Sequence, residues 1–326
     1  MGVIRRFFRT WVVGKLLKRN PVVFALATAV GLLRRGRRLA REVPLSTLRS
    51  RGRVGADFFE RRGLVDDSPG TPAPAGELVD LDAFARPQSE PATDAAADGF
   101  DPDDVDDEVH HFCEHTADYD FTYRVRWGRG FRLGARLVAP LTSRIEQLNL
   151  PGKGTGWRRL RSRFVALALP DDPRDDVRGW VRTDEDGACV FLATYGTHVA
   201  GADDPDDTGD GPAGERLVNV AVPLPFCTLS TVLRARNFEK GDAGLLGRGG
   251  VPGGLEWTTA GPGHPGLYLR FPLLPVRLPV SQRFRVWPAP ADAADAAGNT
   301  DDLLRATHEM WLFGLKFLKV EYRMAG

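Results

Sequence analysis

The chain has 326 residues, a formal net charge of +1, 24 prolines and 36 glycines. Its length is sufficient to bury a large core. The three cysteines, Cys113, Cys189 and Cys227, are an odd number without CxxC spacing, which argues against a disulfide framework and a zinc ribbon. This cysteine usage favours a reducing, cytoplasmic location.

The near-neutral total hides two oppositely charged segments. Residues 1–55 contain 14 Arg and Lys against Glu42 alone, a net charge of +13. Residues 64–110 contain 14 Asp and Glu against Arg86 alone, a net charge of −13. We therefore expect the acidic segment either to stay solvated or to fold back and mask the basic one.

Composition divides the chain into a basic helical tail (1–63), an acidic Pro- and Ala-rich linker (64–104) and a globular domain (105–326). The linker is poor in hydrophobic residues, so it has little apolar surface with which to offset the entropy of ordering. We expect a disordered linker, interrupted at most by a short helix over Leu78 to Phe84. The globular domain is expected to begin near Asp101 and to need nothing upstream.

The beginning of the tail combines basic and aromatic residues in a roughly amphipathic helix. Basic charge together with Phe and Trp is typical of binding to anionic lipid headgroups. Packing on the chain's own domain and nucleic-acid binding are the alternatives. The predicted membrane-binding residues are Arg5, Arg6, Phe7, Phe8, Arg9, Trp11, Lys15, Lys18 and Arg19.

An apolar run follows from Pro21 to Leu33. Its 13 residues would span about 20 Å as a helix, short of the roughly 30 Å hydrocarbon core. Arginines follow it directly and no small-residue cleavage site is present, which argues against a signal peptide. We therefore expect a peripheral protein on the inner face of the cell membrane.

Two helices and a strand are predicted between Val105 and Pro151. Val105, Val109 and Phe112 have helical spacing, and residues 121–127 alternate between apolar and basic side chains. A second helix follows, with a leucine-rich stripe that we expect to be buried against the sheet. This stripe consists of Leu133, Leu137, Leu141, Ile145 and Leu148.

Beyond Pro151 the hydrophobic period changes to two, and Gly-, Pro- and Asp-rich turns separate the segments. The expected strands cover residues 161–169, 177–183, 188–199, 216–222, 228–236, 254–259, 266–271, 279–287, 304–313 and 315–324. No long helical pattern is available for βαβ crossovers. The sequence predicts a mainly β, α+β fold, in which antiparallel strands curl into a barrel-like sheet packed against two helices.

A metal site is one hypothesis, because Glu108, His111 and His115 share a helix face. No second ligand pair is visible, so the favoured interpretation is that these residues form the polar outer face of that helix. The glycine-rich segment 151–157 follows a helix and precedes a strand, the reverse of a phosphate loop, and no Gly-x-Ser-x-Gly motif occurs. No cofactor is predicted.

A barrel of eight or more strands is about the size at which a small ligand fits inside. We therefore expect an apolar pocket beneath the second helix, with a polar ligand head held at its rim. The predicted ligand-binding residues are Arg144, Gln147, Asn149, Trp127, Trp180, Tyr195 and Trp311. Binding of an apolar small molecule or lipid is the favoured function; an enzyme using polar residues at the cavity mouth and an interaction or scaffold domain are the alternatives.

Several short motifs share their order with known sequences. They are Phe112–Thr116, Glu146–Pro151, Gly179–Thr183, Val222–Pro225 and Trp311–Tyr322. Over residues 108–324 the chain resembles a group of uncharacterised bacterial proteins. The resemblance implies a single domain and transfers no activity.

Overall fold

The computed structural model describes residues 37, 40–85, 99–152, 156–200, 214–237, 253–272, 274–289 and 302–326. The predicted membrane-binding residues, from Arg5 to Arg19, and the apolar run 21–33 lie outside this described part. Among the described residues, no helix combines the length and hydropathy that a membrane span requires.

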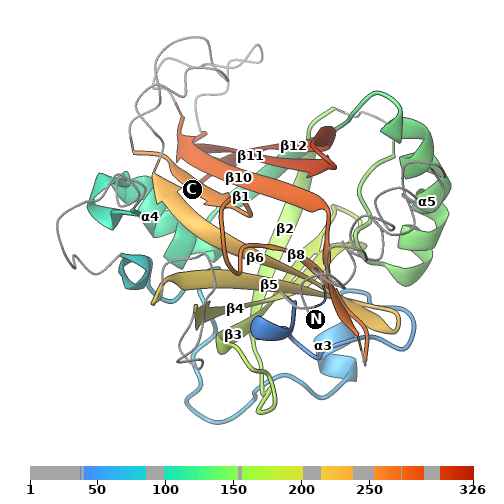
Figure 1. The fold of residues 1–326 in the computed structure, drawn as a ribbon, viewed down its shortest axis with the longest axis horizontal. Helices are drawn as coiled ribbons and strands as arrows, with labels where there is room; N and C mark the ends of the chain where they lie inside the picture. The colour runs from blue at the N-terminus through green and yellow to red at the C-terminus, as the bar shows by residue number, and fades with distance from the viewer. Residues whose placement is uncertain are drawn as a thin grey trace, which may run out of the picture.

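The fold is built on a closed antiparallel barrel of ten strands. Figure 1 shows how these strands are arranged. Around the barrel the order is β5-β4-β3-β2-β1-β12-β11-β10-β7-β6, and β6 pairs with β5 to close it. The barrel strands are β1 (Asp120–Trp127), β2 (Arg158–Ala166), β3 (Asp175–Thr183), β4 (Cys189–Val199), β5 (Arg216–Leu224), β6 (Cys227–Asn237), β7 (Leu255–Thr258), β10 (Val280–Pro288), β11 (Leu304–Leu312) and β12 (Leu315–Ala325). The predicted barrel-like antiparallel sheet is confirmed.

The long strand β6 explains how two further strands join the sheet. Its first half pairs with β8 (Gly266–Arg270) and its second half with β7, on the edge opposite β5. The short strand β9 (Pro275–Leu278) then pairs with β8 outside the closed barrel. Strand β9 was not predicted, because its four residues begin with Pro275 and are followed by Pro279, which leaves too short a pattern to show a period of two.

Alternation along each strand separates an apolar interior from a charged exterior. In β12, Val320 and Tyr322 face inward, whereas Glu321 faces outward and bonds to two arginines of the neighbouring β1. These ion pairs are partly exposed, so each contributes about 1 kcal/mol or less. The fold is therefore specified mainly by the apolar side chains that face the interior of the barrel.

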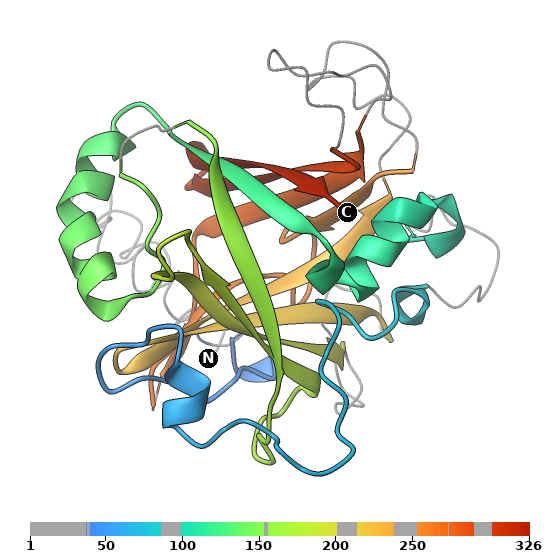
Figure 2. The same ribbon diagram turned by 180° about the vertical axis from the view of Figure 1, so that it is seen from behind.

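Helices α4 (Asp107–Glu114) and α5 (Phe131–Ile145) flank the barrel on opposite sides in both views, Figures 1 and 2. Asp106 caps the N-terminus of α4, and its carboxylate accepts a hydrogen bond from the backbone N–H of Glu108. It buries Val109 and Phe112 as predicted. Since β1 runs from α4 to α5, the two helices mark the two ends of the barrel.

Three of the five residues in the predicted apolar stripe face away from the barrel, so the prediction of a buried stripe was wrong for these three. Ile145 and Leu148 are partly buried. Leu133, Leu137 and Leu141 are 65%, 73% and 59% exposed. The partly buried face of α5 carries mostly small or polar side chains instead: Phe131, Ala135, Ala139, Thr142 and Ile145. Helical periodicity identifies an amphipathic helix, but it does not identify which face meets the protein.

Residues upstream of Asp101 also pack on the barrel. Phe58 and Phe59 of α3 (Phe58–Arg61) are buried against the outer face of β3 and β4, and Phe84 meets Trp257 edge to face at 5.3 Å. The expectation of an unpacked linker is therefore wrong for residues 64–85 and 99–104. The average composition of these segments did not reveal their packing, because a few widely spaced apolar residues are enough to hold a polar segment against the barrel.

Three one-turn 3-10 helices accompany these packed segments. They are η1 (Asp82–Phe84), η3 (Pro102–Asp104) and η4 (Thr116–Asp118). The predicted short helix between Leu78 and Phe84 is thus present as η1, with Phe84 as its buried side chain.

Candidate ligand-binding site

The barrel encloses a cavity of about 360 Å³. Inward-facing side chains of medium size, such as Leu160, Val220 and Leu233, form most of its wall. Ten strands enclose a wider space than eight, and side chains of this length do not reach across it. The cavity is therefore a consequence of the strand number together with the inward residues.

The end of the cavity nearest α5 is apolar. Thr142 of α5, Leu148 and Leu150 after it, and Phe317 of β12 line this end. Trp127 also lines it, and its indole Nε1 donates to the carbonyl oxygen of Pro151 at 2.8 Å. A ligand lying in the cavity would contact hydrocarbon on every side at this end.

The wall contains one buried guanidinium, that of Arg182 in β3. Arg182 is 8% exposed, and its Nε has no hydrogen-bond partner in the described part of the chain. The guanidinium lies over the rings of Trp180, Phe121 and Tyr322, 3.7, 4.6 and 5.4 Å from their centroids. These aromatic contacts stabilise the cation partially, since ring quadrupoles attract positive charge.

Glu77 faces the same cavity from a segment that the sequence analysis assigned to the linker. Its backbone N–H donates to the Thr116 Oγ1 at 3.2 Å, and the next residue, Leu78, donates to the carbonyl of Cys113 at 3.0 Å. Gly76 makes this close approach possible, because a Cβ there would overlap the backbone of Glu114. Burial raises the pKa of Glu77 to about 7, although the positive charge of Arg182 opposes the shift.

The remaining polar groups of the lining are neutral near pH 7. Burial raises the pKa of Tyr195 and of Tyr322, so both phenols stay protonated. Burial, and next the charge of Arg182, lowers the pKa of His308 to about 4, which leaves its imidazole neutral. Its Nε2 lies 3.3 Å from the Gln282 Oε1. Of the described residues that line the cavity, only Arg182 and Glu77 carry formal charge near neutrality.

The predicted aromatic residues are divided between the inside and the outside of the barrel. Trp127, Trp180 and Tyr195 line the cavity. Trp311 does not line the cavity. The cationic groups of Arg283 and Lys316, on the outside of the barrel, each lie 5.3 Å from the centroid of its ring. The neighbouring residue, Met310, supplies the inward side chain instead.

The three predicted polar rim residues lie outside the cavity. Gln147 is fully buried, and its amide links Leu192 and Pro223 through bonds of 2.9 and 3.2 Å. The Asn149 side chain accepts a hydrogen bond from the Ser143 hydroxyl at 3.0 Å, and Arg144 is exposed on α5. Gln147 therefore anchors the chain where α5 ends.

The two charged residues that face the cavity, Arg182 and Glu77, were not predicted, and only Arg182 had a signal in the sequence. Arg182 is two residues from Trp180 on a strand, so the two must share a face. No sequence signal indicated that Glu77 faces the cavity, because tertiary packing determines the position of its segment.

The proposed metal-ligand set is engaged in other contacts. The Glu108 carboxylate accepts a hydrogen bond from the Tyr119 hydroxyl at 2.7 Å. The rings of His111 and His115 are stacked with centroids 4.6 Å apart. Within the described ranges, no group of three or more His, Cys, Asp or Glu side chains is arranged to hold a metal ion.

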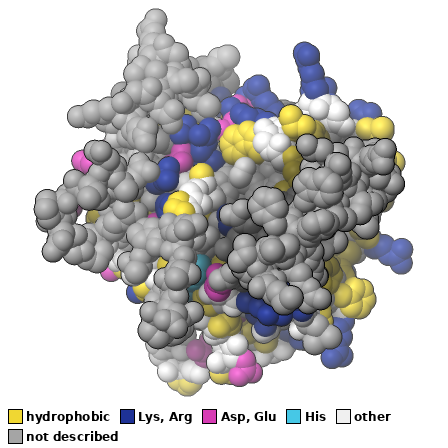
Figure 3. Space-filling view, in the orientation of Figure 1, with side chains coloured by type: hydrophobic (Ala, Val, Ile, Leu, Met, Phe, Trp, Pro, Cys, Tyr) yellow, Lys and Arg dark blue, Asp and Glu magenta, His cyan; other side chains and the backbone are white. Residues whose placement is uncertain are grey.

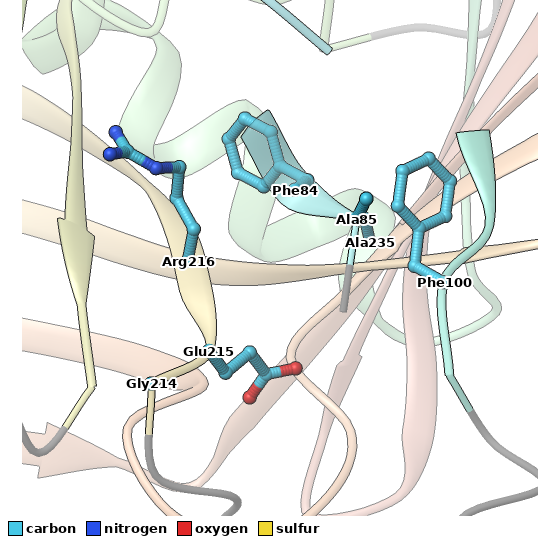
Figure 4. Close-up of a pocket in the computed structure, with 7 residues that line it drawn as sticks. All are labelled: Phe84, Ala85, Phe100, Gly214, Glu215, Arg216 and Ala235. Carbon is cyan, nitrogen blue, oxygen red and sulfur yellow. The ribbon is translucent and has the colours of Figure 1, made fainter. Parts of the chain in front are cut away.

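A second hollow, shown in Figure 4, lies where Phe84 and Phe100 meet β5 and β6. Its volume is about 10 Å³, about the space for one water molecule. The Glu215 carboxylate there forms an ion pair with Arg234, with an N–O distance of 2.7 Å. Figure 4 shows the side chain of Arg216 pointing away from that of Glu215. This hollow is too small for an organic ligand.

Comparison with known proteins gives one informative similarity. No family model matches the chain, and no solved structure matches it. The chain is 28% identical over 223 residues to the "uncharacterized membrane protein YndJ" of Bacillus subtilis (strain 168), covering 68% of this chain and 35% of that protein. The chain thus spans about a third of the length of that relative. The predicted resemblance to an uncharacterised bacterial protein is confirmed.

Proposed function

We propose that the barrel binds an apolar small molecule or a lipid. The observation that carries this proposal is the cavity of about 360 Å³, whose wall is largely hydrocarbon. Its polar lining groups include Glu77, Tyr195, His308 and Tyr322, which interact electrostatically with Arg182. Ligand pockets in proteins have volumes of about 300 to 1,000 Å³ and combine mostly apolar walls with a few placed polar groups. The proposed ligand has an apolar body and a polar head.

An environment-sensitive apolar dye tests this proposal. The folded protein is expected to bind the dye with saturation, and long-chain lipids are expected to displace it. Val220→Trp fills the cavity from its wall and should weaken dye binding by at least about tenfold, a loss of about 1.4 kcal/mol. Val79→Trp makes the same change at a residue that is 60% exposed, and should leave binding unchanged.

Circular dichroism of both variants verifies folding, because overpacking costs about 1–3 kcal/mol. Wild-type protein that binds no dye with saturation would contradict the proposal.

A second proposed function is attachment to an anionic membrane surface, through the basic tail and also through α5. Residues 128–145 contain four arginines and no acidic residue, and the exposed leucines of α5 lie beside them. Figure 3 shows hydrophobic and basic side chains together at the edge of the molecule where α5 lies in Figure 1. An apolar stripe beside basic residues is the pattern of a helix that lies in the lipid interface.

The turn between β11 and β12 enlarges this surface. Phe313 and Leu315 are 71% and 66% exposed. They lie near the start of α5, because Phe131 contacts Phe317 with ring centroids 5.8 Å apart. The name of the relative, a membrane protein, is in keeping with this proposal.

Co-sedimentation with anionic and neutral vesicles tests attachment. The protein should bind anionic vesicles and dissociate as the salt concentration rises. Replacing Leu133, Leu137 and Leu141 with Gln should weaken binding by at least about tenfold, since each leucine contributes apolar area to the interface. Val79→Gln with Leu303→Gln is the matched control, since these exposed apolar residues lie on other elements.

A protein that lacks residues 1–36 separates the two contributions. Equal binding with and without those residues would exclude the tail as the attachment element. Equal binding by the triple leucine variant would exclude α5.

A further inference from the structure

We propose that the head of the ligand is an anion, such as a carboxylate, which Arg182 binds at the polar end of the cavity while Glu77 takes up a proton. The inference rests on the proposed ligand-binding function and specifies the chemical class of the ligand. Two observations support the inference. Some buried hydrogen-bond donors in the cavity have no acceptor among the described residues, and one titratable group in the cavity can change its charge near neutral pH.

Arg182 provides the first step. A guanidinium removed from water loses its solvation, and this loss must be offset by an acceptor. The Nε of Arg182 lacks an acceptor in the described part of the chain, and Tyr322 supplies a hydrogen-bonding contact to the same guanidinium. A planar guanidinium is suited to a carboxylate, which accepts two parallel hydrogen bonds from it.

Trp180 provides a second donor beside the first. It is 2% exposed, and its indole Nε1 has no hydrogen-bond partner among the described residues. Trp180 and Arg182 both line the cavity, and the guanidinium stacks on the indole ring at 3.7 Å. Two adjacent buried donors without acceptors favour a head group rich in acceptor oxygens over a cationic one.

Glu77 determines the charge balance. An anionic head would enter a site that already contains this carboxyl group, and two like charges in a buried space repel. With a pKa of about 7, the Glu77 carboxyl can lose its own charge by taking up a proton near neutral pH. An anion on Arg182 removes the positive charge that favours ionised Glu77, so binding raises the pKa of Glu77 further.

The tyrosines and the histidine around Glu77 do not exchange protons near neutrality. Tyr195 and Tyr322 remain protonated, and His308 remains neutral, as described above. From α4, burial also raises the pKa of the Cys113 thiol, and the Glu114 carboxylate is engaged by the backbone N–H of Leu81 at 2.8 Å. Glu77 is therefore the group in this cluster that can compensate an incoming anion.

Decanoate and 1-decanol form a matched pair of probes, since they share an alkyl chain and differ in head charge. Displacement of the bound dye should show decanoate binding at least about tenfold more tightly than decanol, because charge-assisted bonds are stronger than neutral ones. Arg182→Met should remove this preference and leave decanol binding unchanged. Arg126→Met, on the outer face of β1 with a side chain 56% exposed, is the control and should change neither.

Calorimetry in buffers of different ionisation enthalpy measures the proton. At about pH 7.5 the wild type should take up a fraction of a proton on binding decanoate, and its decanoate affinity should fall as the pH rises above that value. Glu77→Gln should bind decanoate at least as tightly as the wild type, take up no proton, and show an affinity that does not change with pH.

Equal affinity for decanoate and decanol in the wild type would overturn the inference, and so would decanoate binding without proton uptake. If decanoate and decanol bind with equal affinity and the dye also binds, the proposed ligand-binding function of the cavity still holds. Failure of dye, decanol and decanoate alike would instead remove both proposals. If Arg182→Met does not fold, as judged by circular dichroism, the proton measurement on the wild type and Glu77→Gln decides.

Discussion

The two charged residues of the cavity impose opposite requirements on the protein. Arg182 carries a permanent charge, so its burial must be offset by neighbouring rings and acceptors. Glu77 can avoid the same cost by remaining protonated, and its raised pKa is the sign of that response. A buried ionisable group in a cavity is typical of a binding site, because the folded protein would be more stable with a well-packed apolar residue at that position.

Glu77 should make the stability of the protein depend on pH. Its pKa is about 7 in the folded state and 4.5 for an unperturbed glutamate, so the folded state binds more protons between these two pH values. The contribution of Glu77 to stability is therefore fully present below about pH 4.5 and is lost as the pH rises through about 7. Glu77→Gln should raise the free energy of unfolding at about pH 8 by on the order of 2 kcal/mol and change it little at about pH 4.5.

Urea denaturation of both proteins at several pH values measures this difference. A constant difference between the wild type and Glu77→Gln across the range would show that Glu77 titrates in the folded protein as it does in water.

At the scale of elements, α4 and α5 are both amphipathic, and yet they relate to the barrel in different ways. Helix α4 buries Phe112 to 1% exposure, whereas the leucines of α5 are more than half exposed. The chain after α5 is fixed by the buried amide of Gln147, and Glu146 and Leu148 on either side adopt positive φ values of 49° and 53°. These backbone constraints, rather than the hydrophobic pattern, set the orientation of the helix.

The two helices should therefore respond differently to substitution. Gln at Leu133, Leu137 and Leu141 should change the free energy of unfolding by less than about 0.5 kcal/mol per site, the range of surface substitutions. Phe112→Ala in α4 should lower it by about 3–5 kcal/mol, because it leaves a cavity in the core. Chemical denaturation curves test this contrast, and a loss of about 2 kcal/mol or more at Leu137 would place the α5 stripe in a packed interface.

At the scale of the whole molecule, the barrel is completed by segments that precede it in the chain. Val54, Phe58 and Phe59 cover the outer face of β3 and β4. Leu45 packs with Leu217 and Tyr268. The segment around Glu77 and Leu78 contributes to the cavity wall itself. The upstream segments therefore contribute side chains to three hydrophobic clusters that also contain barrel residues. We expect the barrel and these segments to unfold together.

Two truncated proteins test this dependence. A chain that begins at residue 37 should retain a cooperative thermal transition and near-ultraviolet circular dichroism. A chain that begins at Asp101 should lose both, because it exposes the apolar outer face of β3 and β4 and removes Glu77 from the cavity wall. A cooperative transition in the shorter chain would show that the upstream segments are dispensable.

Most of the β-structure was predictable from local patterns in the sequence. A period of two identified the strands after Pro151, and Gly, Pro and Asp marked their limits, because both signals are local properties of the chain. The helices over 107–114 and 131–145 were also evident from their period. Trp127, Trp180 and Tyr195 were correctly placed on the cavity wall, since large aromatic side chains on alternating strands usually face inward.

Tertiary contacts determine which face of α5 meets the barrel and which side of β11 carries Trp311. They also determine how the acidic segment brings Glu77 to Arg182. A helix or strand has two faces, and the choice between them depends on contacts with residues far away in the chain. The polar groups of the site come from elements that are distant in sequence, namely residue 77, β3, β4, β11 and β12. Their convergence follows from closure of the barrel, which no local pattern encodes.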